Sequence, residues 1–138
     1  MSKQTAAGAM IAVKDVMKKK YDMVDGLATV RQALTLMKHI ETKCLIVDKR
    51  HENDEYGIVV LADIARHVLA ENRSPDRVSI YEVMTKPAVT IHPNMDIRYA
   101  SQLFARLGLS RAPVVEGGKV IGIVSHTDMV LKGLMHLV

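Results

Sequence analysis

The 138-residue sequence contains little cysteine, few aromatic residues and no long apolar run. Its single cysteine, Cys44, cannot form an internal disulfide, which favours a reducing compartment and makes the cytoplasm the expected location. No segment approaches the roughly 20 consecutive apolar residues of a membrane-spanning helix, so we expect a protein that is neither exported nor embedded. Tryptophan is absent and aromatic residues make up 4% of the chain, which leaves few side chains on which bases could stack.

Sequence signatures of catalysis are missing as well. The chain has no G-x-S-x-G motif, no P-loop and no G-x-G-x-x-G motif. Cys44 lies in the apolar run CLIV, where burial would disfavour the thiolate that a nucleophile needs. The six histidines are scattered without the spacing of metal ligands. We therefore predict no enzymatic activity, no catalytic cofactor and no metal.

The charge balance is mildly basic, with a formal net charge of +4 and a run of three lysines at positions 18–20. Such a balance permits a phosphate-bearing ligand without indicating a nucleic acid, so we do not expect nucleic-acid binding. The lysine run is most simply a solvated basic surface. The alternative is that one or more of these lysines meet ligand phosphates at the rim of an adjacent cleft.

The chain repeats itself once. The segment VKDVM at 13–17 matches IYEVM at 80–84, 67 positions later, and VRQAL from position 30 matches IRYAS at the same offset. KCLIVD from position 43 then corresponds to RAPVVE, and GIVVLAD from position 57 corresponds to GIVSHTD from position 122. Because the unit occurs only twice, a closed pair is favoured over a solenoid, which needs several units to bury a continuous core.

Periodicity predicts the same order of elements in both copies: strand, helix, strand, strand, helix. Apolar residues at helical spacing follow the N-cap candidates Thr29 and Asp96, and the short apolar runs between them are typical of strands. We expect an α/β (α+β) fold. The first copy has a short strand at 23–24, a helix after position 29 and a second helix at 64–70. The second copy has a short strand at 89–91, a helix after position 96 and a second helix at 129–137. The predicted limits are 10–71 for the first unit and 78–138 for the second, with a tail at 1–9 and a polar, proline-containing linker at 72–77.

The duplicated pattern resembles a pair of cystathionine-beta-synthase-type (CBS) domains, known together as a Bateman module. The resemblance rests on VM near the start of each unit, on an apolar run ending in PVV before a turn, and on GIVSHTD at the last strand. It covers about residues 10 to 137 and implies two pseudo-two-fold related units with up to two clefts between them. Such clefts commonly bind AMP, ADP, ATP or S-adenosylmethionine, and such modules often form homodimers.

The main candidate site lies in GIVSHTD, where two hydroxyls and a carboxylate follow an apolar strand: Ser125, Thr127 and Asp128. Ser125 and Asp128 also have the spacing of a capping box, which would stabilise the last helix by roughly 1 kcal/mol without any ligand. Thr127 favours ligand binding, because a cap needs only the first hydroxyl, whereas a ligand with ribose and phosphate can use both. The resemblance implies that Asp128 accepts from the ribose hydroxyls. Both interpretations can hold together.

The resemblance adds further residues to this main cleft. Arg111 stands where related AMP-binding proteins place a basic residue against the phosphate, a task that suits the planar guanidinium, although a solvated surface arginine is the alternative. Asp22 and Met23 stand where adenine is contacted, although Asp22 departs from the small or apolar residue common there.

The second cleft would use Asp63, Lys43, Ala88 and Val89, with Lys43 taken as the match of Arg111. Its own half has lost both hydroxyls, because Val60 and Ala62 replace them. We therefore expect a weak or empty site, and Asp63 is alternatively an acid that interacts with the helix dipole.

The leading hypothesis is a regulatory module that binds an adenosine ligand and signals to a protein partner that the sequence does not identify. The alternative is a protein-interaction or dimerisation module with degenerate clefts. A homodimer is expected because six residues of the last helix would form an exposed apolar surface; these are Met129, Val130, Leu131, Leu134, Met135 and Leu137.

Overall fold

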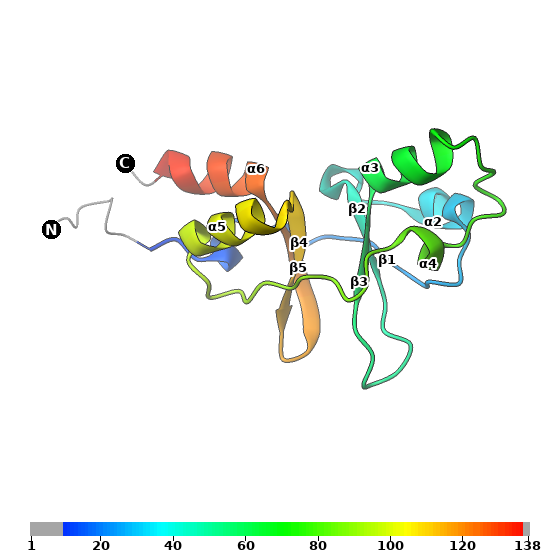
Figure 1. Cartoon of the computed structure of the whole chain (residues 1–138). Coiled ribbons are helices and arrows are strands. Elements are labelled where there is room, and N and C mark those ends of the chain that lie inside the picture. The colour runs from blue at the N-terminus through cyan, green and yellow to red at the C-terminus, as the bar shows by residue number, and fades with distance from the viewer. Residues whose placement is uncertain (1–9, 137–138) are drawn as a thin grey trace, which may run out of the picture. The chain divides into compact units, whose positions relative to one another are not determined.

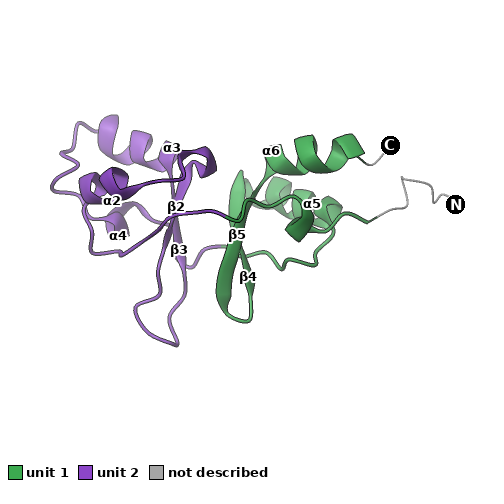
Figure 2. Cartoon of the chain, turned by 180° about the vertical axis from the view of Figure 1, so that it is seen from behind, with its two compact units in different colours: residues 1–19, 89–138 green, residues 20–88 purple. Residues whose placement is uncertain are grey.

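The computed structural model of the chain describes residues 10–136. Two compact units are present: one comprises residues 20–88, and the other comprises residues 89–138 together with the segment that ends at Lys19 (Figure 2). Each unit has its own buried apolar cluster. No helix among the described residues is both long and apolar enough to cross a membrane.

The unit of residues 20–88 is built on a three-stranded sheet with strand order β1-β2-β3. The strands are β1 (Met23–Val24), β2 (Cys44–Val47) and β3 (Gly57–Val60), with β1 parallel and β3 antiparallel to β2. Most of its helical elements lie on one side of the sheet (Figure 1); they are α2 (Val30–Leu36), α3 (Leu61–Ile64), η3 (Ala65–Leu69) and α4 (Ile80–Val83). A short turn, η2 (Ile40–Thr42), precedes β2. Every residue of β2 is buried, which explains why CLIV reads as an unbroken apolar run.

The other unit contains the antiparallel hairpin of β4 (Arg111–Glu116) and β5 (Lys119–Ser125). Gly117 and Gly118 make the predicted turn, both with positive φ. Helical elements pack on one side of this hairpin (Figure 1), and their bounds are η1 (Val13–Asp15), α5 (Ile97–Leu107), α6 (His126–Asp128), η4 (Met129–Gly133) and η5 (Leu134–His136). The last three are consecutive turns of one helical segment, with a π-helical turn at η4.

Both predicted N-caps are confirmed. The Thr29 hydroxyl accepts a hydrogen bond from the Gln32 N–H at 3.1 Å, and the Asp96 carboxylate accepts one from the Arg98 N–H at 2.9 Å. Each cap pairs a backbone donor that the first helical turn leaves without an intrahelical partner. The order strand, helix, strand, strand, helix is confirmed for the first copy.

Some elements differ from the sequence-based expectation. The expected strand at 89–91 is reduced to Ile91, which forms a single bridge with Val114. Short helical turns occupy the VM segments at Val13–Asp15 and Ile80–Val83, where none was predicted. The predicted tail at 1–9 lies outside the described residues.

The compact units do not follow the predicted limits of 10–71 and 78–138. Val13 and Val16 are buried in the cluster of the second repeat, whereas Ile80 and Val83 are buried in the cluster of the first. Backbone hydrogen bonds fix this exchange, because Lys18 pairs with Ile123 in both directions at 2.8 and 2.9 Å. Thr85 pairs with Ile58 at the same two distances. The first segment of each repeat is therefore packed on the strands of the other repeat.

Candidate functional site

The hydroxyl of Ser125 closes the end of β5 and starts α6. Ser125 is buried, and its Oγ accepts a hydrogen bond from the Asp128 N–H at 3.1 Å. Thr127 lies between them on the first turn of the helix and is exposed. The predicted capping role of Ser125 is confirmed, and the exposed Thr127 hydroxyl plays no part in that cap.

Asp128 is 5% exposed, so its charge requires partners inside the unit. Its Oδ2 lies 2.5 Å from the Lys18 Nζ and its Oδ1 lies 3.6 Å from the Lys132 Nζ. The capping box predicted this carboxylate at the backbone N–H of Ser125. It engages two lysines instead, so the carboxylate half of the predicted box is wrong.

Arg111 begins β4 directly beside this group, because its Cα is paired with Ser125 in the hairpin register. Its Nε donates to the Ser110 Oγ at 3.2 Å, and the Ser110 carbonyl accepts from the first N–H of α6 at 3.0 Å. Three cationic side chains, Lys18, Lys132 and Arg111, thus gather at the end of the unit that carries one buried carboxylate. Such a surplus of positive charge favours an anionic ligand over a cationic one.

Lys18 and Lys132 were not among the predicted site residues. The signal for Lys18 was the lysine run directly after the repeated VM segment. The sequence did not predict that the first segments of the two repeats exchange places. This exchange puts Lys18 next to β5 of the second repeat instead of next to the strands of its own repeat.

The start of α3, which corresponds to the start of α6, carries different side chains. Val60 stands at the N-cap position of α3 and offers no hydroxyl, and Asp63 pairs with Arg66 on its own helix, with 2.5 Å between Oδ1 and Nη1. A hollow of about 200 Å³ beside Asp63 is also lined by Arg73, Glu82 and Thr85. The Ser79 N–H, with Arg73, holds the pKa of the Glu82 carboxyl below its usual value.

Lys43 does not occupy the position of Arg111. In the pairing register Cys44 lies opposite Val60, as Arg111 lies opposite Ser125. The Lys43 carbonyl accepts the first N–H of α3 at 3.0 Å, which is the contact that Ser110 makes in the other unit. The predicted match of Lys43 with Arg111 was therefore wrong by one residue, and a buried cysteine stands in place of the guanidinium.

Two of the residues predicted to contact adenine, Asp22 and Ala88, form hydrogen bonds with backbone groups of the chain. Both carboxylate oxygens of Asp22 accept backbone N–H groups, from Lys38 at 2.9 Å and from His39 at 2.8 Å, so this side chain fixes the chain that follows α2. Met23 is partly exposed in β1. Ala88 donates its N–H to the Tyr56 carbonyl at 2.8 Å and ends one compact unit, and Val89 begins the other. Their contacts with adenine stay a prediction.

Among residues 10–136, no group of three or more histidine, cysteine, aspartate or glutamate side chains is placed to hold a metal ion. The polar groups that the structure does bring together are Ser125, Asp128, Arg111 and the two lysines. A carboxylate can accept from sugar hydroxyls, and the cations can donate to a phosphate.

The family model for the CBS domain matches the chain twice, over residues 13–70 and 80–133. A protein of Methanopyrus kandleri is 30% identical over 78% of this chain and 56% of its own length. The CBS domain-containing protein YhcV of Bacillus subtilis is 30% identical, and the match covers 89% of this chain and 86% of YhcV. The chain thus spans somewhat more than half of the archaeal relative and most of the bacterial one.

Solved structures of CBS-domain proteins are similar to this chain as well. A hexameric CBS-CP12 protein from bloom-forming cyanobacteria superimposes with a TM-score of 0.85 at 37% identity, covering 89% of this chain and 71% of that one. The CBS domain pair of protein MJ0100, solved with 5′-methylthioadenosine and S-adenosylmethionine, gives a TM-score of 0.72 at 25% identity over 88% and 94% of the two chains. A Pyrobaculum aerophilum protein complexed with AMP gives 0.75 at 18% identity over 92% and 98%, a likeness that shows the fold alone.

Proposed function

Since the chain belongs to the CBS domain family, as a tandem pair, we propose that it is a non-enzymatic regulatory module that binds a phosphate-bearing adenosine ligand. The ligand would be AMP, ADP or ATP, held at the end of the unit that carries Ser125, Thr127 and Asp128. Arg111 would donate to the phosphate, and Asp128 would accept from the ribose. Asp22 and Met23 stay the proposed adenine contacts.

The observation that carries this proposal is the buried Asp128 carboxylate with cations beside it. Burying a carboxylate costs free energy unless it is paired, and here the Lys18 ammonium pairs with it inside the unit. A ligand phosphate provides a second anion for Lys18, so the carboxylate oxygen that Lys18 occupies becomes available to ribose hydroxyls as the lysine turns to the phosphate. The local charge disfavours S-adenosylmethionine, which carries a positive sulfonium.

One relative supports the adenosine part of the proposed ligand. 5′-Methylthioadenosine and S-adenosylmethionine occupy the CBS pair of MJ0100. We propose only weak ligand binding at Asp63, because its carboxylate pairs with Arg66. In addition, Val60 and Ala62 stand where the other copy has the hydroxyls of Ser125 and Thr127. We further propose action in the cytoplasm, at least as a homodimer, on a protein partner that responds to the bound state.

Isothermal titration calorimetry with AMP, ADP, ATP and S-adenosylmethionine tests the proposal. We expect mid-micromolar or tighter binding of at least one nucleotide and weaker binding of S-adenosylmethionine. A nucleotide at 100 times its dissociation constant should add about 2.7 kcal/mol to the free energy of unfolding, which a thermal shift would detect. No heat and no thermal shift with any of the four ligands at millimolar concentration would refute the proposal.

A second candidate function is a docking or dimerisation module whose clefts no longer bind ligand. The Lys18–Asp128 pair favours it, because the acceptor for ribose is already satisfied within the chain. The same titrations separate the two functions, since a docking module gives no nucleotide heat.

A further inference from the structure

A separate hollow lies in the unit of residues 20–88, at the end of the sheet away from Asp63. Its volume is about 660 Å³, within the range of small-molecule sites. The pairing register gives its place: Cys44 lies opposite Val60, which adjoins α3, whereas Val47, at the other end of β2, lines the hollow. The site proposed for adenosine ligands therefore does not account for it.

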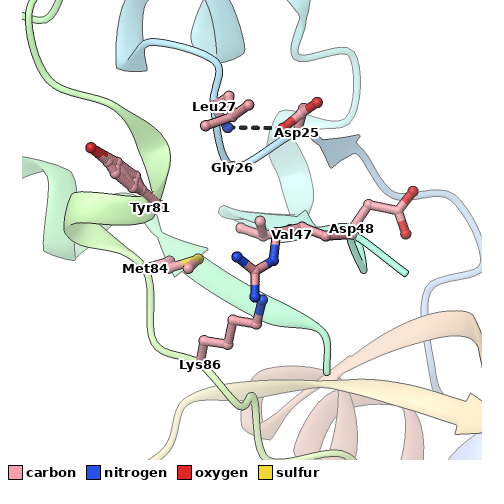
Figure 3. A pocket seen from close by; sticks show the side chains of 9 residues that line it. Asp25, Gly26, Leu27, Val47, Asp48, Tyr81, Met84 and Lys86 are labelled. Carbon is pink, nitrogen blue, oxygen red and sulfur yellow. Dashed lines mark hydrogen bonds between the residues drawn. The ribbon is translucent and has the colours of Figure 1, made fainter. Parts of the chain in front are cut away.

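Apolar side chains form its walls. Val47 is a buried wall residue, and Leu27, Tyr81 and Met84 surround it (Figure 3). Leu27 and Tyr81 are largely exposed although both are large and apolar, which is typical of the rim of a binding site. Gly26 also lines the hollow, and a Cβ at this position would make ordinary contacts with the Val47 and Tyr81 side chains, 3.4 and 3.7 Å away, so only a larger side chain would fill the space.

Two aspartates line the same hollow. Asp25 and Asp48 directly follow the last paired residues of the parallel strands β1 and β2 (Figure 3). Each accepts a backbone N–H, from Leu27 at 2.9 Å and from Lys49 at 2.8 Å, and neither has an ion-pair partner within the described part of the chain. Carboxylates without an ion-pair partner favour a cationic group on a ligand.

Two cations border the same hollow and share one counterion. The Arg50 Nε and the Lys86 Nζ lie 3.1 and 2.8 Å from the same oxygen, Oδ2 of Asp54. These contacts, with Lys86 contributing most, hold the pKa of the Asp54 carboxyl well below its usual range. One carboxylate facing two cations leaves a surplus of positive charge, which favours an additional anion.

Acidic and basic side chains line the same part of this hollow. A second hollow of about 290 Å³ shares Asp25, Asp48 and Arg50 with the first, so these residues mark the junction of the two. A simple cation would meet Arg50 there, and a simple anion would meet the two aspartates. A molecule that carries both charges close together meets a complement to each.

We propose that this hollow is a second ligand site that takes a free α-amino acid with a large apolar side chain. The ammonium group pairs with Asp25 and Asp48, the carboxylate pairs with Arg50, and the side chain lies against Leu27, Tyr81 and Met84. The other repeat does not preserve these groups. There the backbone N–H of Lys14 donates to the Pro93 carbonyl, as the backbone N–H of Tyr81 donates to the Gly26 carbonyl, so a lysine and a proline replace the aromatic residue and the glycine.

Calorimetry with L-phenylalanine on the full chain, without nucleotide, tests the proposal. We expect saturable binding that weakens about five-fold or more with 2-phenylethylamine and with 3-phenylpropionate, because each has lost one charged contact at an exposed site. L-alanine should bind more weakly still, because it buries little apolar surface. No heat with phenylalanine overturns the site, and equal affinity for either singly charged analogue overturns the amino-acid assignment.

Three variants locate the binding. Gly26→Leu fills the hollow and should abolish phenylalanine binding, whereas Gly26→Ala, whose Cβ makes ordinary contacts, should retain it. Arg50→Gln should weaken phenylalanine about five-fold and leave 2-phenylethylamine unchanged. Since the Arg50 side chain is 73% exposed, this variant keeps the fold, and the melting temperature verifies it. Wild-type affinity in both Gly26→Leu and Arg50→Gln overturns the proposal.

Discussion

At the scale of single residues, burial separates Asp128 from the other acids of the chain. Only three polar side chains are buried among the described residues, and two of them, Ser125 and Asp128, meet at the start of α6; the third is Thr42. Thr42 has an evident backbone role, because its hydroxyl donates to the His39 carbonyl at 2.8 Å. Asp128 has no such role, since its carboxylate is held by side chains that a ligand can compete for.

Asp128→Asn should weaken nucleotide binding by roughly 1.5–3 kcal/mol, as expected for a lost hydrogen bond to a charged acceptor. Asp63→Asn is the matched control and should change affinity far less, because Asp63 pairs with Arg66 and its unit lacks both hydroxyls. Calorimetric affinity and the ligand-free melting temperature should be measured for both variants. A lower melting temperature for Asp128→Asn with unchanged affinity would indicate a structural ion pair only. Equal losses of affinity would show that the Asp63 site is occupied.

Lys18→Met distinguishes a lysine that contacts phosphate from one that only neutralises Asp128. We expect AMP to bind about five-fold more weakly, whereas adenosine, which has no phosphate, keeps its affinity or gains some because the carboxylate is released. Lys132→Met is the control, since Lys132 is more exposed and lies 3.6 Å from the carboxylate. Titration of each variant with AMP and adenosine gives the answer. Parallel losses for both ligands would contradict a phosphate contact.

At the scale of elements, the exchanged segments explain the glycine that opens GIVV and GIVS. A Cβ on Gly122 would lie 2.6 Å from the Lys18 carbonyl oxygen and 2.7 Å from the Met17 Sδ. Gly57 has the same neighbours in the other unit, with 3.1 Å to the Met84 Sδ and 3.3 Å to the Thr85 carbonyl oxygen. Each glycine therefore lets the VM segment of one repeat cross the last strand of the other.

Gly122→Ala should lower the free energy of unfolding by about 1–3 kcal/mol, the usual cost of overpacking. Gly57→Ala should cost less, because its nearest contacts are longer and the closest is a flexible thioether. Chemical denaturation of both variants measures the difference. If Gly122→Ala displaces Lys18, nucleotide affinity falls as well, and that effect is absent from Gly57→Ala. Equal stabilities of the two variants would contradict the close approach at Gly122.

Local pattern predicted the elements well because their signals are local. Thr29 and Asp96 were identifiable as caps from the apolar spacing that follows each of them, and the hairpin at Gly117 and Gly118 from its short polar connection. The exchange of VM segments was not predictable in this way, since periodicity identifies an apolar side without identifying what covers it. For the same reason Lys18 entered only as an alternative, within the lysine run, and not among the main candidate residues. The one-residue error at Lys43 arose because KCLIVD and RAPVVE align by composition, whereas the register depends on strand pairing.

At the scale of the whole molecule, the C-terminal helical segment divides into a covered and an uncovered side. Met129 is buried, and a Cβ on Gly133 would clash with Ile97, so this side is committed to the core. Including Met129 in the exposed apolar surface was therefore wrong, and Leu137 lies outside the described residues. Four predicted members do remain between 47% and 67% exposed; they are Val130, Leu131, Leu134 and Met135.

Exposed apolar residues that adjoin one another on a helix are typical of an interface, and a second copy of the chain is the partner always present at equal concentration. We therefore expect sedimentation to give at least a dimer at tens of micromolar protein. The double variant Leu131→Glu with Leu134→Glu should shift the protein to monomer, because it places charges where apolar contact is expected. Leu107→Glu is the matched control, since Leu107 is 49% exposed on α5, and it should leave the assembly intact. A wild-type monomer at this concentration, or equal assembly of the double variant and the wild type, would show that this surface does not join copies of the chain.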